Sequence, residues 1–158
     1  MADEMKLANA QKAYAIICSA LDQRNWRYNK DEEKFVTYFG VNGEDLPMQF
    51  IIRADEERQL IRLHSPLSFK IGEDKRVEGS VATNMMNYRM ADGSFEYNLA
   101  DGTIVFKMTA SYHDTEISED LIHYMIGCSC AMVDKYNDGL LALSKGIISI
   151  NEFVEKYM

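Results

Sequence analysis

The residues that could do chemistry in this chain are few, and most of them stand apart from one another. The sequence has three histidines, His64, His113 and His123. Only His113 has close acidic neighbours, Asp114 and Glu116, and a histidine beside carboxylates could act as a base or bind a metal. Three residues within one turn do not make a coordination set, so a solvated strand end is the simpler interpretation.

Nucleophilic catalysis also lacks a candidate. A serine, threonine or cysteine nucleophile needs an adjacent base, on a strained turn or at the start of a helix, and no segment has that pattern. The nine glycines are scattered, without a phosphate-binding motif. Adjacent acidic residues occur in loops and first helical turns, where solvated charge is ordinary. The residue types therefore predict a protein that is not an enzyme and has no cofactor and no metal site.

The cysteines predict no disulfide framework. There are three of them, Cys18, Cys128 and Cys130, and an odd number in a chain of this size does not suggest paired cysteines. A Cys-x-Cys pair with no further cysteine or histidine nearby is a poor zinc signal. We expect three buried free thiols, because free cysteine is among the most buried residue types.

Length and charge limit the classes of partner. The 158 residues fit a single domain spanning 1–158. Acidic residues outnumber basic ones by 25 to 17, for a formal charge of −8, which argues against nucleic acid and against an anionic membrane surface. This charge would suit a partner with basic segments. The N-terminus lacks a signal-peptide pattern and no stretch reaches the length of a membrane span, so we expect a cytoplasmic location.

The clearest structural signal is a β-hairpin between Asp92 and Tyr112. Apolar and polar residues alternate on both sides of Asp101-Gly102, a dipeptide typical of a two-residue type I′ turn. The predicted cross-strand pairs are Leu99 with Ile104, Tyr97 with Phe106, and Phe95 with Met108. All six side chains would then share one face of the sheet.

Three further strands are predicted before this hairpin. Phe35–Val41 is rich in aromatic and β-branched residues, whereas 30–34 is a charged break. Met48–Ala54 and Gln59–His64 form a second hairpin, in which Ala54 lies opposite Gln59. Residues 65–72, which include Pro66, are expected to be irregular.

Four helices follow from apolar spacing and capping residues. The first covers 4–23, with a stripe of Leu7, Ala10, Tyr14, Ile17 and Leu21. The second runs from a cap at Asp74 to Tyr88, and its stripe consists of Val77, Val81, Met85 and Tyr88. The third begins at the cap Ser118 and continues to Ser144, and a short fourth helix begins at a capping box at Ser149.

The order helix, three strands, helix, two strands, long helix, short helix indicates an α+β fold (α-β-β-β-α-β-β-α). A five-stranded antiparallel sheet packed by helices on one face would bury the apolar stripes. Its other face would carry residues such as Arg53, Arg62, Glu96 and Lys107.

Two sets of apolar residues are candidates for binding. Met5, Ile16 and Ala20 lie nearly opposite the main stripe of the first helix, so we expect them to contact a second subunit. Met85, Met86 and Met132 belong to a set of ten methionines. Because methionine adapts to varied partners, these three are candidates for lining a partner groove.

The chain resembles the YbjN-domain family, bacterial proteins described as sensory transduction regulators. The residues that carry the likeness are Asn84-x-x-Asn87, Gly93-Ser94-Phe95, Asp101-Gly102, Ile117-Ser118-Glu119-Asp120-Leu121, Asp134 and Leu140, with a weaker likeness from Trp26 to His64. The family is similar in fold to the chaperones of type III secretion, which are small, acidic and usually dimeric and hold an extended client segment. The resemblance supplies no catalytic residue.

Three functional hypotheses follow. The first is a non-enzymatic protein-binding module, chaperone-like or regulatory, which forms a homodimer and binds a partner polypeptide. The second is a small-ligand sensor with a pocket between the long helix and the sheet, lined by Tyr97, Phe106 and Met132. The third is an enzyme that uses His113 and the acids beside it.

Overall fold

A computed structural model describes residues 2–158 of the chain, with the side chains from Asp3 onward. Its elements, in chain order, are α1 (Ala2–Gln23), β1 (Asn29–Asp31), β2 (Val36–Asn42), β3 (Pro47–Asp55), β4 (Leu60–Lys70), the 3₁₀ turn η1 (Glu73–Lys75), α2 (Arg76–Arg89), β5 (Ser94–Tyr97), β6 (Thr103–Ser111), α3 (Glu119–Ser144) and α4 (Ile150–Tyr157).

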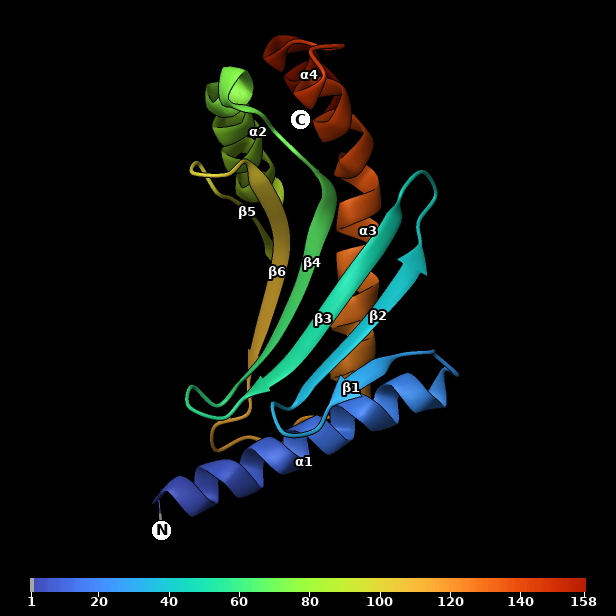
Figure 1. The fold of residues 1–158 in the computed structure, drawn as a ribbon, viewed down its shortest axis with the longest axis vertical. Helices are drawn as coiled ribbons and strands as arrows, with labels where there is room; N and C mark the ends of the chain where they lie inside the picture. Colours follow the sequence, from blue (N-terminus) through green and yellow to red (C-terminus); the bar gives the residue numbers. More distant parts are fainter. Residues whose placement is uncertain (1) are drawn as a thin grey trace.

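The strands form one antiparallel sheet in the order β1-β2-β3-β4-β6-β5. Figure 1 shows α3 behind this sheet, α1 across its lower end, and α2 and α4 at its upper end. The α+β prediction is confirmed, but the sheet has six strands and not five. The additional strand, β1, begins at Asn29 and overlaps the start of the segment predicted as a charged break. Lys30 and Asp31 are tolerated there because an edge strand can keep charged side chains in water.

The core lies between the sheet and α3. Phe95 and Phe106 are buried, with ring centroids 5.0 Å apart, and Tyr136 of α3 lies 5.8 Å from Phe95. Along β3 the even-numbered residues from Met48 to Ala54 are buried, whereas Gln49 and Arg53 are exposed. The predicted alternation of the strands therefore places the apolar side chains on the covered face.

The register of the β5–β6 hairpin differs by two residues from the prediction. Phe95 pairs with Phe106 and Tyr97 with Ile104. The connection is longer than two residues because the Asn98 and Asp101 side chains accept hydrogen bonds from the N–H groups of Ala100 and Thr103, respectively. As a result Leu99 lies in the loop and is exposed, so its predicted place opposite Ile104 is wrong.

Gly102 is required in this loop. Its φ of 76° lies in the left-handed region, and a Cβ at this position would lie 2.0 Å from the carbonyl oxygen of Ile71. The Gly102 carbonyl in turn accepts a hydrogen bond of 2.9 Å from the Ile71 N–H. The loop is thus fixed by the end of β4, a contact that is distant in sequence.

The β3–β4 hairpin shows the same displacement. Ala54 pairs with Ile61 and not with Gln59. The reason is again a side chain that bonds to the backbone: Asp55 Oδ1 accepts from the Arg58 N–H at 3.1 Å, and Gln59 takes a φ of 54°. A shift of two residues leaves every side chain on its predicted face.

β4 also continues through the stretch predicted to be irregular. It reaches Lys70, with a register shift between Pro66 and Lys70 in its pairing with β6. Pro66 has no N–H to donate, but the pairing of β4 with β3 ends at His64, so no bond to β3 is lost.

The amide of Asn87, near the end of α2, covers the free edge of β5. Its Nδ2 donates to the Phe95 carbonyl and its Oδ1 accepts from the Phe95 N–H, both at 2.8 Å. Side-chain amides can satisfy an edge strand in this way, as a neighbouring strand would. Asn84, three residues earlier, is exposed.

Candidate functional site: a groove beside helix α1

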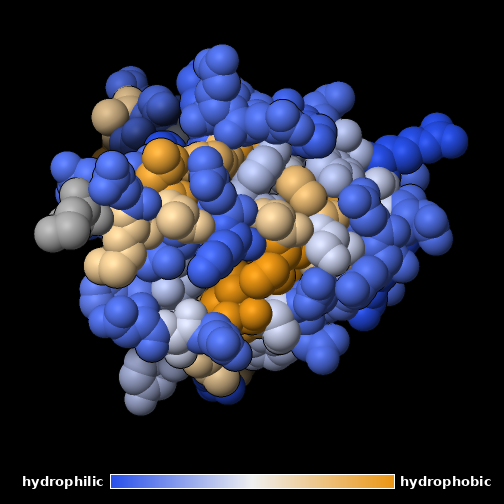
Figure 2. Space-filling model, turned by 90° about the horizontal axis from the view of Figure 1, so that it is seen from below, coloured by the Kyte–Doolittle hydropathy of each residue, from blue (hydrophilic) through white to orange (hydrophobic). Residues whose placement is uncertain are grey.

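A groove of about 600 Å³ runs between α1 and the segment that joins β6 to α3. Its lining residues are Asn9, Lys12, Ala13, Ala15 and Ile16 from α1, and Tyr112, Asp114, Thr115, Glu116 and Ile117 from the joining segment. Figure 2, which views this end of the molecule, shows hydrophobic surface surrounded by hydrophilic residues. The groove thus combines apolar side chains with polar and charged ones, as protein-binding surfaces do.

The groove exists because its two walls are held apart at one end of the sheet. α1 packs against β3 and α3 through its buried face, which includes Ala10, Ala13 and Ile17. The opposite wall leaves β6 at Tyr112, passes through Asp114 in a left-handed conformation (φ 51°), and enters α3 at the cap Ser118. Ile117 directly precedes that cap and packs against the core, so the cap fixes one end of the wall.

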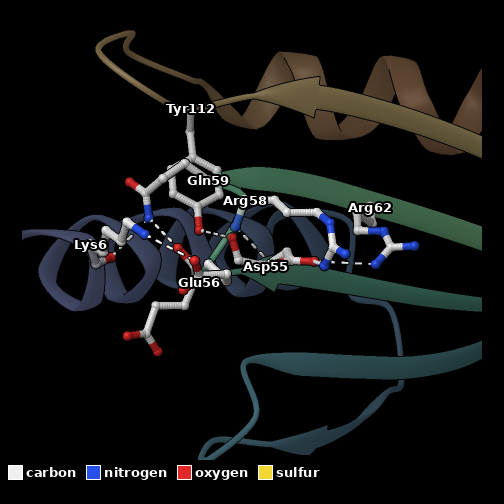
Figure 3. Close-up of polar contacts among 8 residues, drawn as sticks. Lys6, Asp55, Glu56, Arg58, Gln59, Arg62 and Tyr112 are labelled. Carbon is white, nitrogen blue, oxygen red and sulfur yellow. Dashed lines mark hydrogen bonds and ion pairs between the residues drawn. The ribbon is translucent and has the colours of Figure 1, made fainter. Parts of the chain in front are cut away.

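Polar contacts bind the β3–β4 turn to the first half of α1, close to the groove (Figure 3). The buried Gln59 amide donates to the carbonyl oxygens of Lys6 and Glu56, at 3.2 and 2.7 Å. Asn9, a lining residue, donates to Gln59 Oε1 at 3.1 Å. Since buried amide groups are costly to leave unpaired, these contacts fix α1 relative to the sheet.

Asp55 is a buried carboxylate within the same network. Burial alone would raise its pKa, but hydrogen bonds from the Arg58 N–H and from Arg62, with the charges of Arg58 and Arg53, lower it below the ordinary 3.8. Arg62 Nη1 lies 3.2 Å from Asp55 Oδ2. Asp55 is therefore ionised at neutral pH and anchors the arginines around it.

Tyr112 connects this network to the groove. Its hydroxyl donates to the Asp55 carbonyl at 2.7 Å, and its N–H donates to the Gln59 carbonyl at 3.0 Å. Burial, with the nearby acids Asp55 and Glu56, raises the pKa of Tyr112 from 10.0 to about 12. Tyr112 is a neutral, immobilised wall of the groove and not a proton donor for chemistry near neutral pH.

The three residues predicted for self-association occupy different environments. Met5 is 63% exposed on α1, and Ile16 is half-buried and lines the groove. Ala20 is fully buried in the chain's own core, and its carbonyl oxygen lies 2.8 Å from His123 Nε2. Its placement on an exposed face is corrected, because α1 packs against α3 there. Self-association through Met5 and Ile16 stays a prediction.

The predicted methionine groove is not formed as a continuous surface. Met86 is fully buried beneath α2, while Met85 and Met132 are half-buried. None of the three lines the groove beside α1. The sequence pattern identified Ile16 on one wall of that groove but not Tyr112 and Ile117 on the other. The sequence feature that could have pointed to the second wall is Ile117, an apolar residue directly before a helix cap.

The space proposed for a small-ligand pocket is filled by side chains. Phe106, one of its predicted lining residues, is fully buried against Phe95, which in turn contacts Tyr136. A Cβ at Gly93 would lie 2.4 Å from Phe106 Cζ, so the ring is tightly enclosed on that side as well. Packing of this density gives no support to a cavity lined by Tyr97, Phe106 and Met132.

The group around His113 lies open to solvent. His113 Nδ1 is 3.1 Å from Asp114 Oδ2, with the two side chains 67% and 84% exposed, and Glu116 is also exposed. Among residues 2–158 no three His, Cys, Asp or Glu side chains are grouped to hold a metal ion. None of the helices described here combines the length and the apolar character that a membrane span requires.

An antiparallel sheet packed by helices, with an apolar groove at one end, defines the class of fold and site. Comparison with known protein families then identifies the family. The chain belongs to the YbjN family, described as "Putative bacterial sensory transduction regulator", whose model matches residues 13–142. No curated protein matches the chain. Among solved structures, the fold is similar to a chain of the HopA1–SchA chaperone–effector complex, with 10% identity over 89% of this chain and 94% of that one and a TM-score of 0.49.

Proposed function

We propose that this protein is a non-enzymatic, regulatory or chaperone-like protein-binding module that forms a homodimer and binds a partner polypeptide. The observation that carries the proposal is the groove between α1 and residues 112–117. The family description, which names regulators and no reaction, supports the same class of function. A regulator without chemistry of its own acts through the molecules that it contacts.

The lining of the groove suits a polypeptide. Ala15 is small and exposed and allows a partner backbone to approach α1 closely, while Ile117 offers apolar contact on the opposite wall. Lys12, Asp114 and Glu116 add charge of both signs. A segment laid between a helix and a loop can place apolar side chains inward and satisfy its polar groups with such charged residues.

The proposed homodimer forms through α1. Met5 and Ile16 are separated by about three helical turns and share one face of the helix. In a two-fold dimer the same residues of both copies meet, so one exposed helix can supply the whole contact. The partner polypeptide would then contact the opposite wall, which includes Ile117.

Ile16→Glu tests the dimer. Because a buried carboxylate would be left without a partner in the interface, we expect the molar mass from light scattering to fall from two chains to one. The matched control is Leu99→Glu, the same kind of change in an exposed loop, which should remain dimeric. Circular dichroism checks that both variants fold. An unchanged mass of Ile16→Glu, or a wild-type monomer at all concentrations, would refute the dimer.

Ile117→Glu tests the partner site separately. Wild type, Ile117→Glu and Leu99→Glu are each immobilised and exposed to lysate of the native host, and the retained proteins are identified by mass spectrometry. We expect one protein to be retained by wild type and Leu99→Glu and lost from Ile117→Glu. Equal retention by all three variants would exclude this wall as the partner site.

A further inference from the structure

The face of the sheet that α3 leaves uncovered carries its own arrangement of side chains. Figure 1 shows strands β2 and β3 crossing in front of α3. The residues that project from the uncovered face alternate with the buried ones, and they include Tyr38, Ile51, Arg53, Arg62, His64 and Lys107. None of these residues lines the groove beside α1.

Two arginines lie directly opposite each other on this face. Arg53 of β3 pairs with Arg62 of β4 in the register of the sheet. Like charges directly across an antiparallel pair are unfavourable, so a nearby anion is expected. Asp55 supplies it for Arg62 and Arg58, at 3.2 and 3.4 Å. Arg53 has no ion-pair partner among the residues that the structure describes.

The surplus positive charge is local. Arg53, Arg58 and Arg62 surround one carboxylate, Asp55, which all three help to keep ionised by lowering its pKa. Further along the face, Lys107 is already paired with Glu96. The chain as a whole has a formal charge of −8. This cluster is therefore a positively charged region of a protein that is negatively charged overall.

Apolar surface adjoins the arginines. Tyr38 is 41% exposed and pairs across the strands with the half-buried Ile51. Ile51 and Arg53 are two residues apart on one strand and therefore project from the same face at a spacing of about 7 Å. Tyrosine and arginine beside an aliphatic residue are the side chains that contribute most to binding energy in protein interfaces.

We propose that this uncovered face is a docking surface for an acidic polypeptide segment of a partner protein, in which a carboxylate meets Arg53 and Arg62 and a neighbouring apolar side chain packs on Tyr38 and Ile51. Charge complementarity selects this occupant. The planar guanidinium groups can accept a carboxylate in two-point contact, and a ligand charge would relieve the repulsion between Arg53 and Arg62. The surface adds a second, positively charged contact to the binding function proposed for the groove.

Fluorescence anisotropy with three synthetic peptides tests the proposal. The peptides alternate Glu with Leu, Lys with Leu, and Glu with Ser. We expect wild type to bind the Glu/Leu peptide about tenfold or more tightly than either of the others, with an affinity that falls as salt is raised. Arg53→Glu should lower that affinity at least about tenfold, and Tyr38→Ser should lower it severalfold.

Arg89→Glu is the matched control, because it makes the same charge change at the exposed end of α2; it should bind as wild type does. Equal losses of affinity for the Glu/Leu peptide in Arg53→Glu and Arg89→Glu would overturn the proposal. It would also be overturned if wild type bound none of the peptides or bound all three equally. Tighter binding of a single-stranded oligonucleotide than of the Glu/Leu peptide would assign the face to nucleic acid instead. If wild type is a dimer and Arg53→Glu is a monomer, the face belongs to the contact with a second copy of this chain, and the proposal is overturned. Since Ile16 and Ile117 lie outside this face, failure here leaves the groove proposal standing.

Discussion

Helices α1 and α2 have similar apolar periodicity in sequence but opposite relations to the core. The stripe predicted on α1 is buried from Ala10 to Leu21. The stripe predicted on α2 faces water instead: Val77 is 76% exposed and Tyr88 is 89% exposed. Regular spacing of apolar residues is thus sufficient to predict a helix, but it does not determine which side of that helix is buried.

The buried side of α2 consists of small residues and one methionine, namely Gly79, Ala82, Thr83 and Met86. At Gly79 a Cβ would lie 3.0 Å from the Ile71 side chain and 3.2 Å from the Tyr97 ring. Thr83 satisfies its hydroxyl by donating to the Gly79 carbonyl at 2.9 Å. At Gly79, α2 approaches the sheet closely enough to exclude a larger side chain, whereas Val77 and Tyr88 project outward.

The largest expected difference between the helices is at their apolar stripes. Ile17→Ala in α1 removes a fully buried side chain and should lower the free energy of unfolding by about 2–5 kcal/mol. Val77→Ala in α2 should change it by less than about 0.5 kcal/mol, as exposed substitutions do. Urea denaturation measures both values. Similar losses in the two variants would mean that the Val77 face of α2 is covered in solution.

A polar network also fixes the β3–β4 turn beside α1, and the contribution of its buried carboxylate, Asp55, should depend on pH. Asp55→Asn removes the charge bonded to Arg58 and Arg62 and should cost about 1.5–3 kcal/mol at neutral pH. Because folding lowers the pKa of Asp55, its contribution is fully present above the unfolded value of 3.8 and is lost as pH falls through the folded pKa. Urea denaturation from pH 7 into acid should therefore show wild type and variant converging only below 3.8.

Asp114→Asn is the control for this experiment, because both Asp114 and its ion-pair partner His113 are exposed. It should differ little from wild type at any pH. A gap between wild type and Asp55→Asn that persists unchanged in acid would contradict the lowered pKa.

The smallest effect in this series concerns the small residues of α2. Gly79→Leu overpacks the contact with Ile71 and Tyr97, and leucine also favours helix more than glycine does, leaving a net loss of about 1–2 kcal/mol. Gly127→Leu on α3 has open space around its Cβ position, so it should be neutral or stabilising. Thermal unfolding followed by circular dichroism compares the two. Equal stability of both variants would show that α2 can move away from the sheet.

The sequence predicts which face each strand buries but not the pairing of the hairpins. Both registers are displaced by two residues, and such a shift preserves the apolar pattern, so the pattern cannot detect it. What sets each register is local side-chain bonding by Asp55, Asn98 and Asp101. The missing strand β1 is short, charged and on the edge, and lacks a hydrophobic signal.

The residues of the candidate sites also fall into two groups: those that the sequence could predict and those that it could not. Ile16 could be selected from its position on α1, and the uncovered sheet face with Arg53 and Arg62 was predicted from alternation. The burial of Ala20 and Met86 depends on tertiary contacts that no local pattern contains. A partner with basic segments follows from the net charge of −8, but this average conceals the arginines opposite each other on the sheet.

The contact between the Asn87 amide and Phe95 limits how the sheet can be extended at its β5 edge. With both backbone groups of Phe95 occupied, an incoming strand cannot bond to this residue, so a ladder between two copies would be interrupted at β5. At the far side β1 pairs only with Val36–Tyr38 of β2. β1 therefore leaves residues 40–42 of β2 without a pairing strand on that side, which gives a client recruited by β-strand addition a place to bond.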